Sequence, residues 1–169
     1  LVTIEGLGPS PKAQEEMAKT PWHEHRRQWI EKKRNSSSRL PKRYATFEAA
    51  LDRMHEENSY LSRAQAEHLT RNGAIRNEDG TWSWKFDPHL HAWPPSDITH
   101  GQLEELWGRI TCPTLMIYGA DSWASNPEKD GRMKHFGDNV SESEYARAGH
   151  WVQHDRFEDF TAEVKAFIE

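Results

Sequence analysis

The chain has 169 residues, of which 29% are charged and 35% are hydrophobic, and its formal net charge is -5. This length fits one domain of ordinary size, and the charge argues against a nucleic-acid partner, which would favour a basic patch. The single cysteine excludes an internal disulfide and favours a reducing, cytoplasmic setting. No run of about eighteen apolar residues is present, so we expect no membrane span, and we see no signal peptide.

The first elements predicted along the chain are a short strand and two charged helices. The apolar run 1–4 indicates a strand that is already in progress at the first residue, as if the chain were cut there. Gly and Pro residues end this strand in a loop that extends to residue 11. Residues 12–34 have a helical, heavily charged composition, and Pro21 is placed to start the second helix. A polar linker follows at 34–39.

Two further helices are predicted from their caps. Thr46 can cap the first, because apolar residues recur after it at helical spacing, namely Phe47, Ala50, Leu51 and Met54. Ser62 and Gln65 form a capping-box pattern at the start of the second. The pair Asn72-Gly73 is expected to end that helix through a left-handed glycine.

A hairpin is predicted around residues 78–80, whose Glu-Asp-Gly sequence favours a turn. In the segment that follows, alternation places Trp82, Trp84 and Phe86 on one face of a strand.

The C-terminal part predicts alternating helices and strands. A helix covers roughly 99–107, and the run 113–118 is continuously apolar, which is typical of a parallel strand buried on both faces. Asn126 and Pro127 can serve as the cap and first residue of a helix that extends to Phe136.

The chain is predicted to end with a strand and a helix. The strand covers 141–146, and Asp155 with Glu158 forms another capping-box pattern before the helix. The apolar stripe of this helix is formed by Phe160, Val164, Phe167 and Ile168.

Two motifs near the end of the chain resemble a known family. The strand at 113–118 is followed by Gly119 and Asp121, and about thirty residues later a short strand leads into Ala-Gly-His-Trp at 148–151. This order resembles the last third of an α/β-hydrolase, and the whole chain resembles that fold from its sixth strand to its end. The segments 44–51, 58–62 and 69–73, together with the Trp-rich strand before Asp87, are similar to the lid of the serine-hydrolase-like branch.

The resemblance implies an α/β fold: the C-terminal part of a parallel sheet with a mainly helical cap or lid inserted. We assign residues 1–11 to a core strand and acid loop, 12–97 to the lid with a small hairpin, and 98–169 to the C-terminal core. No Gly-x-Ser-x-Gly occurs in the sequence, so the nucleophile is expected in a missing N-terminal half, in the same or a second chain. Exposed sheet edges predict association with that half or with another copy.

His150 is the candidate general base. In the family, the His of this loop takes the proton of the nucleophile, and a carboxylate holds its other ring nitrogen. Gly149 lets the backbone turn sharply before it, and Trp151 is expected to pack at the mouth of the site. The alternative is a loop histidine that only hydrogen-bonds to the backbone.

Two carboxylates are candidates for the orienting acid. Asp121 follows the penultimate strand, where most of the superfamily places its acid, but the usual Gly-x-x-Asp spacing falls on Ser122. Glu5 follows the first strand and lies four residues before Pro9, a spacing that resembles the branches that include haloalkane dehalogenases. We favour Glu5 over Asp121, and either residue could instead cap a turn.

Aromatic residues suggest where a substrate would bind. Trp123 and Trp151 flank the two candidate loops and are the substrate-binding candidates, whereas the lid tryptophans are more simply explained by packing; these are Trp22, Trp29, Trp82, Trp84 and Trp93. The His pairs at 23/25 and 89/91 have no third ligand at suitable spacing, so no metal is predicted. No cofactor is implied.

The sequence therefore predicts part of a lidded hydrolase that acts on a small, partly apolar, ester-like substrate. The resemblance implies a Ser nucleophile. An Asp nucleophile, as in dehalogenases or epoxide hydrolases, and a non-catalytic fragment or pseudoenzyme remain the alternatives.

Overall fold

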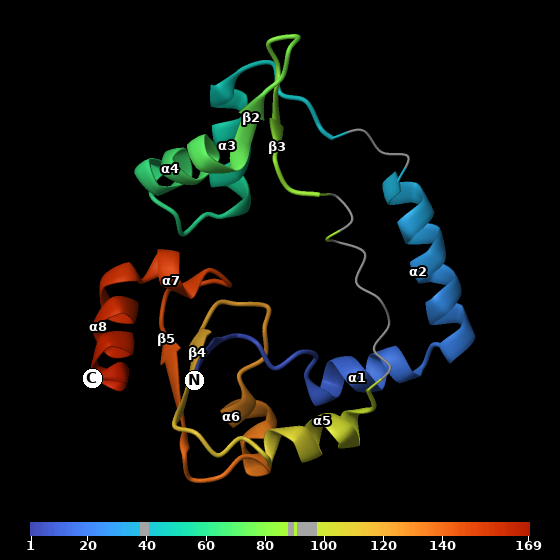
Figure 1. Ribbon diagram of the computed structural model, residues 1–169, viewed down its shortest axis with the longest axis vertical. Coiled ribbons are helices and arrows are strands. Elements are labelled where there is room, and N and C mark those ends of the chain that lie inside the picture. The colour runs from blue at the N-terminus through green and yellow to red at the C-terminus, as the bar shows by residue number, and fades with distance from the viewer. Residues whose placement is uncertain (38–40, 88–89, 91–97) are drawn as a thin grey trace. The chain divides into compact units, whose positions relative to one another are not determined.

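The computed structural model describes residues 1–37, 41–87, 90 and 98–169. Its packing divides the chain into two compact units, which we call the sheet unit, Leu1–Lys19 with Ser96–Glu169, and the helical unit, Thr20–Pro95. Helix α1 (Pro11–Ala18) groups with the sheet unit, although our boundary at residue 12 assigned it to the lid. Figure 1 shows the elements of both units.

The sheet unit is built on three parallel strands. They are arranged in the order β1-β4-β5, with bounds Val2–Ile4, Thr114–Gly119 and Val140–Tyr145. Thr3 lies opposite Met116, and Met116 lies opposite Glu142. Every residue of β4 is buried, as expected for a strand paired on both sides, so the prediction of a buried parallel strand is confirmed.

Successive side chains of a strand point to opposite faces, so the apolar residues of β4 form two clusters, each with a helix packed against it. Leu115 and Ile117 pack with Val152 of α7 (Val152–Asp155) and with three residues of the predicted stripe of α8 (Phe157–Ile168), namely Phe160, Val164 and Phe167. The fourth, Ile168, is exposed. On the other face, Met116 and Tyr118 pack with Leu7 and with Trp107 of α5 (His100–Trp107). This α/β layering agrees with the predicted fold class.

The continuous helix predicted from Asn126 to Phe136 is wrong. The structure instead has a short helix, α6 (Pro127–Asp130), and a 3₁₀ helix, η2 (Arg132–His135). Gly131 separates them with a φ of 82°, a left-handed conformation that glycine adopts without steric cost. Asn126 does cap α6, because its side-chain oxygen accepts a hydrogen bond from the Glu128 N–H at 2.9 Å.

The described residues of the helical unit form three helices and a hairpin: α2 (Trp22–Ser37), α3 (Phe47–Glu57), α4 (Arg63–Gly73), β2 (Ala74–Arg76) and β3 (Trp82–Trp84). Both predicted caps are present. The Thr46 hydroxyl accepts from the Ala49 N–H at 3.1 Å, and Ser62 and Gln65 form a complete capping box.

The end of α4 differs from the prediction. Gly73 is not left-handed, and the chain passes from it directly into β2, whose Ala74 is already extended. Antiparallel pairing then sets Ala74 opposite Trp84, and Gly80 turns the hairpin with a φ of 84°. Phe86 lies beyond β3 and is exposed.

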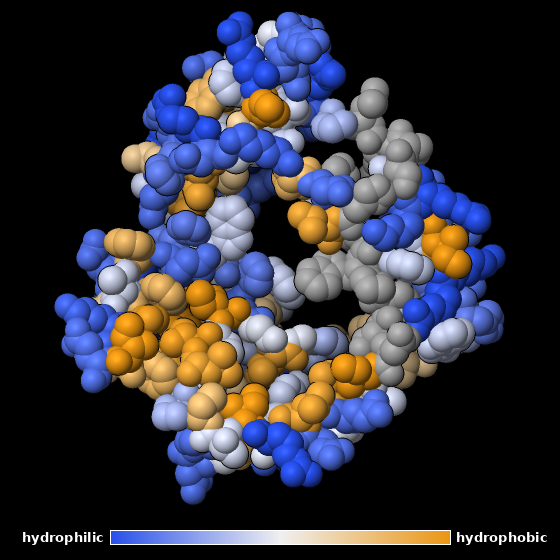
Figure 2. All heavy atoms as spheres, in the orientation of Figure 1, coloured by the Kyte–Doolittle hydropathy of each residue, from blue (hydrophilic) through white to orange (hydrophobic). Residues whose placement is uncertain are grey.

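Apolar surface gathers over the sheet unit, as Figure 2 shows. Leu1 and Ile168 are 54% and 69% exposed, respectively.

Among the helices that the structure describes, none is long and apolar enough to cross a membrane.

Candidate active site

Two loops bring His150 against Glu5. Glu5 follows β1 and His150 follows β5, and the carboxyl ends of parallel strands share one edge of a sheet. Nδ1 of His150 is hydrogen-bonded to Oε2 of Glu5. An ionised carboxylate can only accept, so opposite an ionised Glu5 the donor is Nδ1, and a neutral ring then keeps its lone pair on Nε2.

The Glu5 carboxylate is held by the strand that lies between these two loops. Its side chain has no exposed surface, so its polar atoms depend on protein partners. Oε1 accepts from the Gly119 N–H at 2.8 Å, and Oε2 also accepts from the Ser122 hydroxyl at 2.7 Å. The backbone N–H of Glu5 donates to the Ile117 carbonyl at 3.1 Å. The end of β4 therefore fixes both the backbone and the side chain of Glu5.

Backbone strain is found in both loops. Among the described residues, the non-glycine residues with positive φ are Glu5 at 51° and Arg147 at 55°. Such conformations cost on the order of 1 kcal/mol or more and persist where surrounding contacts determine them. One is the candidate acid itself, and the other lies three positions before His150.

Gly119 allows the two loops to meet. A Cβ at this position would lie 2.3 Å from the Gly149 carbonyl oxygen and 2.5 Å from that of Ala148. Only a residue without a side chain leaves room for the histidine loop to cross the end of β4. The same glycine donates its N–H to Glu5, so close approach and acid binding coincide at one residue.

Asp155 holds the histidine loop from the other side. Its Oδ2 accepts from the Gly149 N–H at 2.8 Å. Burial raises the pKa of Asp155, an effect that this hydrogen bond opposes and that the charge of Glu5 reinforces.

The capping box predicted from Asp155 and Glu158 is wrong: α8 begins at Phe157, and Arg156 at its N-cap makes no side-chain cap.

Aromatic rings lie beside the histidine loop. The ring centroid of Trp123 is 4.5 Å from that of His150, and Trp123 is 81% exposed. The Trp151 ring lies 5.6 Å from that of His154. Of the two aromatic residues predicted to bind substrate, Trp123 is thus placed directly against the candidate base.

Asp121 contributes to this region through its backbone, whose N–H donates to the Ala148 carbonyl at 3.0 Å. Its role as an alternative acid stays a prediction. His89, His91 and Trp93 lie outside the described residues. Within the described part of the chain, no group of three or more His, Cys, Asp or Glu side chains could hold a metal ion.

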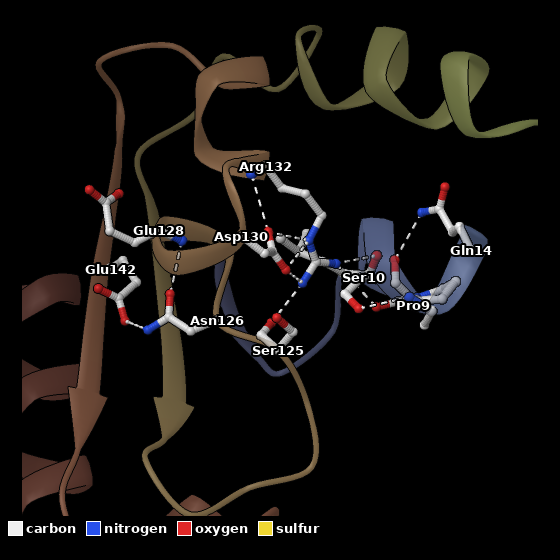
Figure 3. A network of polar contacts seen from close by, with 12 residues as sticks. Pro9, Ser10, Gln14, Ser125, Asn126, Glu128, Asp130, Arg132 and Glu142 are labelled. Carbon is white, nitrogen blue, oxygen red and sulfur yellow. Dashed lines mark hydrogen bonds and ion pairs between the residues drawn. The ribbon is translucent and has the colours of Figure 1, made fainter. Parts of the chain in front are cut away.

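Arg132 ties the loop after β1 to the loop after β4 (Figure 3). It is only 1% exposed, and its guanidinium donates to the carbonyls of Gly8 at 3.1 Å, Leu7 at 3.4 Å and Ser125 at 2.6 Å. It also pairs with Asp130 at 2.8 Å. Burial tends to raise the pKa of Asp130, but hydrogen bonds from Arg132 and Ser125 and the charge of Arg132 together outweigh it, so the pKa is lowered.

The sequence does not predict the roles of three supporting residues. Ser122 stands out only as a departure from the family spacing, and the pattern that begins at Asp155 predicts a helix cap instead. Nothing in the sequence around Arg132 distinguishes it from a surface arginine, because two of its partners are the carbonyls of Leu7 and Gly8, at the other end of the chain.

Comparison with known proteins places this geometry in a familiar fold. No protein-family model matches the sequence, and no curated protein matches it. Solved structures do match: an esterase of M. tuberculosis has a TM-score of 0.71 at 14% identity, over 99% of this chain and 53% of its own. A thioesterase domain from the curacin biosynthetic pathway has a TM-score of 0.68 at 19% identity, over 97% and 56%.

An α/β hydrolase from Novosphingobium aromaticivorans also matches, with a TM-score of 0.59 at 14% identity over 96% of this chain and 53% of its own. The chain thus spans about half the length of each of these structures. It has the α/β-hydrolase fold.

Proposed function

We propose that this chain supplies the base and the acid of a lidded α/β-hydrolase, with His150 as general base and Glu5 as its orienting acid. The observation that carries the proposal is the hydrogen bond between His150 Nδ1 and Glu5 Oε2. The Glu5 side chain is fully buried, whereas that of His150 is 40% exposed. A buried carboxylate behind an accessible imidazole is the arrangement that a triad base requires.

In the proposed reaction, Nε2 of His150 takes the proton of an attacking hydroxyl and later delivers it to the leaving group. Glu5 holds the ring in the required tautomer and stabilises the imidazolium as it forms. The nucleophile, which we expect to be Ser, and the oxyanion donors lie in residues outside this sequence, on the same or a second chain. The proposed route uses no cofactor.

The proposed substrate is a small, partly apolar ester or thioester. Trp123, and Trp151 on the same loop as the base, offer apolar surface for the acyl or leaving group. The names of the similar structures, an esterase and a thioesterase domain, are consistent with acyl transfer to water.

The test measures hydrolysis of an activated aryl ester by the complete protein, in which these residues are joined by the segment that carries the nucleophile. His150→Ala should abolish turnover, whereas His154→Ala, four residues away, should leave most of it. The 169 residues alone should be inert, because a base and an acid provide no covalent route. Full turnover by His150→Ala, or ester hydrolysis by the 169 residues that depends on one of their serines, would contradict the proposal.

A further inference from the structure

We propose that Ser122 is a positioning residue whose hydroxyl holds the Glu5 carboxylate in the orientation that meets His150. This inference rests on the proposed function of the Glu5–His150 pair. It assigns a role to the serine that stands where the family spacing Gly-x-x-Asp would place an aspartate.

The two oxygens of Glu5 are not held equally. Oε1 accepts from the rigid backbone N–H of Gly119 at 2.8 Å, whereas Oε2 accepts from the Ser122 hydroxyl at 2.7 Å and from His150 Nδ1. Without Ser122, the one side chain among the described residues that would still donate to Oε2 is the histidine that the carboxylate is meant to orient. A carboxylate can turn about its terminal bond, so a second donor on Oε2 fixes its plane independently of the ring.

The Ser122 proton is itself directed. A hydroxyl has one proton to donate, and Ser122 Oγ already accepts a hydrogen bond from the Ala124 N–H at 3.1 Å. The Ser122 N–H donates to the Gly119 carbonyl at 3.1 Å. Hydrogen bonds to residues on both sides of Ser122, Gly119 and Ala124, therefore fix its place in the turn after β4. The hydroxyl is therefore placed as a donor toward Glu5 before the histidine loop contributes anything.

The position of Ser122 in the fold explains why this loop provides the donor. Strand β4 lies between β1, which leads to Glu5, and β5, which leads to His150. The loop after β4 is thus the one that borders both partners. At position 122, an uncharged hydroxyl stabilises the ionised form of the Glu5 carboxylate by donating a hydrogen bond to it, whereas a second carboxylate would repel it.

The decisive experiment reads the tautomer of His150 from the ¹⁵N chemical shifts of its two ring nitrogens, in the full chain at a pH where the ring is neutral. The unaltered protein should show the Nδ1–H form, and Glu5→Gln should lose that preference. Ser122→Ala should shift the population measurably toward Nε2–H. Ser122→Thr, which keeps the hydroxyl, should retain the Nδ1–H form, and Ser122→Val, which matches Thr in shape, should not. The Thr/Val pair answers the question even where Ala unfolds the protein.

Kinetics of the complete protein give a second readout. Ser122→Ala should lower kcat about tenfold with little change in KM, because a hydrogen bond to a charged group is lost away from the substrate. Ser141→Ala is the matched control, since its hydroxyl contacts the Thr114 carbonyl on the neighbouring strand, and it should leave kcat unchanged. An unaltered tautomer and kcat in Ser122→Ala and Ser122→Val would overturn the inference. If no variant hydrolyses esters but the tautomer shifts as expected, the proposed function fails and the assignment of Ser122 stands.

Discussion

The hydrogen bonds that we compare inside each of the two units differ in how far apart their partners lie along the chain. In the helical unit, the capping hydrogen bonds of Thr46 and Ser62 join residues three positions apart. In the sheet unit, Glu5 is bonded to partners 114, 117 and 145 positions away. Long loops must be closed before such contacts form, so their cost is greater and their failure affects distant residues together. The comparison teaches that the candidate site depends on the tertiary contacts of one unit, not on local structure.

The largest effect is expected from the acid of the sheet unit. In the complete protein, Glu5→Gln should cut turnover on the order of 10⁴-fold, because the amide no longer holds the required tautomer. Asp121→Asn should have a smaller effect, since it is the Glu5 carboxylate that is hydrogen-bonded to His150. Turnover of an activated aryl ester by both variants decides the matter. A crippled Asp121→Asn beside a nearly silent Glu5→Gln would assign the acid to the later loop.

Arg132 should show the next largest effect. Arg132→Met removes the charge but keeps an unbranched apolar stem, and it leaves Asp130 and three carbonyl groups without their guanidinium partner. Breaking a buried pair in this way costs about 3–5 kcal/mol in free energy of unfolding. The control is Lys129→Met, which removes an ion pair whose lysine is 64% exposed and should cost less than about 1 kcal/mol. Equal losses in denaturant titrations would show that burial does not distinguish the two pairs.

The same difference in range explains what the sequence could predict. The caps at Thr46 and Ser62 were found because the signal and its partner lie within one helical turn. The sequence does not predict the break at Gly131 or the use of Asp155, because a glycine or a capping pattern has several possible uses, and Asp155 accepts from the Gly149 N–H, before the helix that it is expected to cap. Glu5 was favoured over Asp121 only through the family resemblance, since no local pattern relates residue 5 to residue 150.

Two glycines offer a smaller, matched comparison between the units. At Gly119 in the sheet unit, a Cβ would lie 2.3 Å from a backbone oxygen of the histidine loop, so Gly119→Ala should cost about 1–3 kcal/mol and displace His150. At Gly73 in α4, the closest atom would be 3.5 Å away on the Trp84 ring, which is ordinary contact. Gly73→Ala should therefore be neutral or stabilise by up to about 1 kcal/mol, because Ala is the better helix former. Unfolding of both variants in urea measures the difference, and a loss at Gly73 as large as that at Gly119 would contradict it.

The smallest effect concerns pH and has opposite signs in the two units. In the sheet unit, burial raises the folded-state pKa of Asp155 above its unfolded value of about 3.9. The native protein then binds more protons than the unfolded chain between these values, so its stability falls as pH rises through that window. Asp155→Asn keeps an acceptor for the Gly149 N–H without the charge. Its stability relative to the unaltered protein should therefore improve from pH 3 to pH 7.

Asp79, in the hairpin of the helical unit, should behave in the opposite way. Hydrogen bonds from the side chain and backbone of Thr81 lower its pKa, and the charge of Arg43 adds to this. A lowered folded-state pKa means that the carboxylate stabilises the native state above its unfolded pKa, and that this contribution is lost as pH falls through the folded value. Asp79→Asn should therefore lose stability relative to the unaltered protein as pH rises from 3 to 7, by a small amount because the site is exposed to solvent. Denaturant titrations of both variants across this range provide the measurement. Slopes of the same sign would mean that burial at Asp155 does not outweigh its hydrogen bond from Gly149.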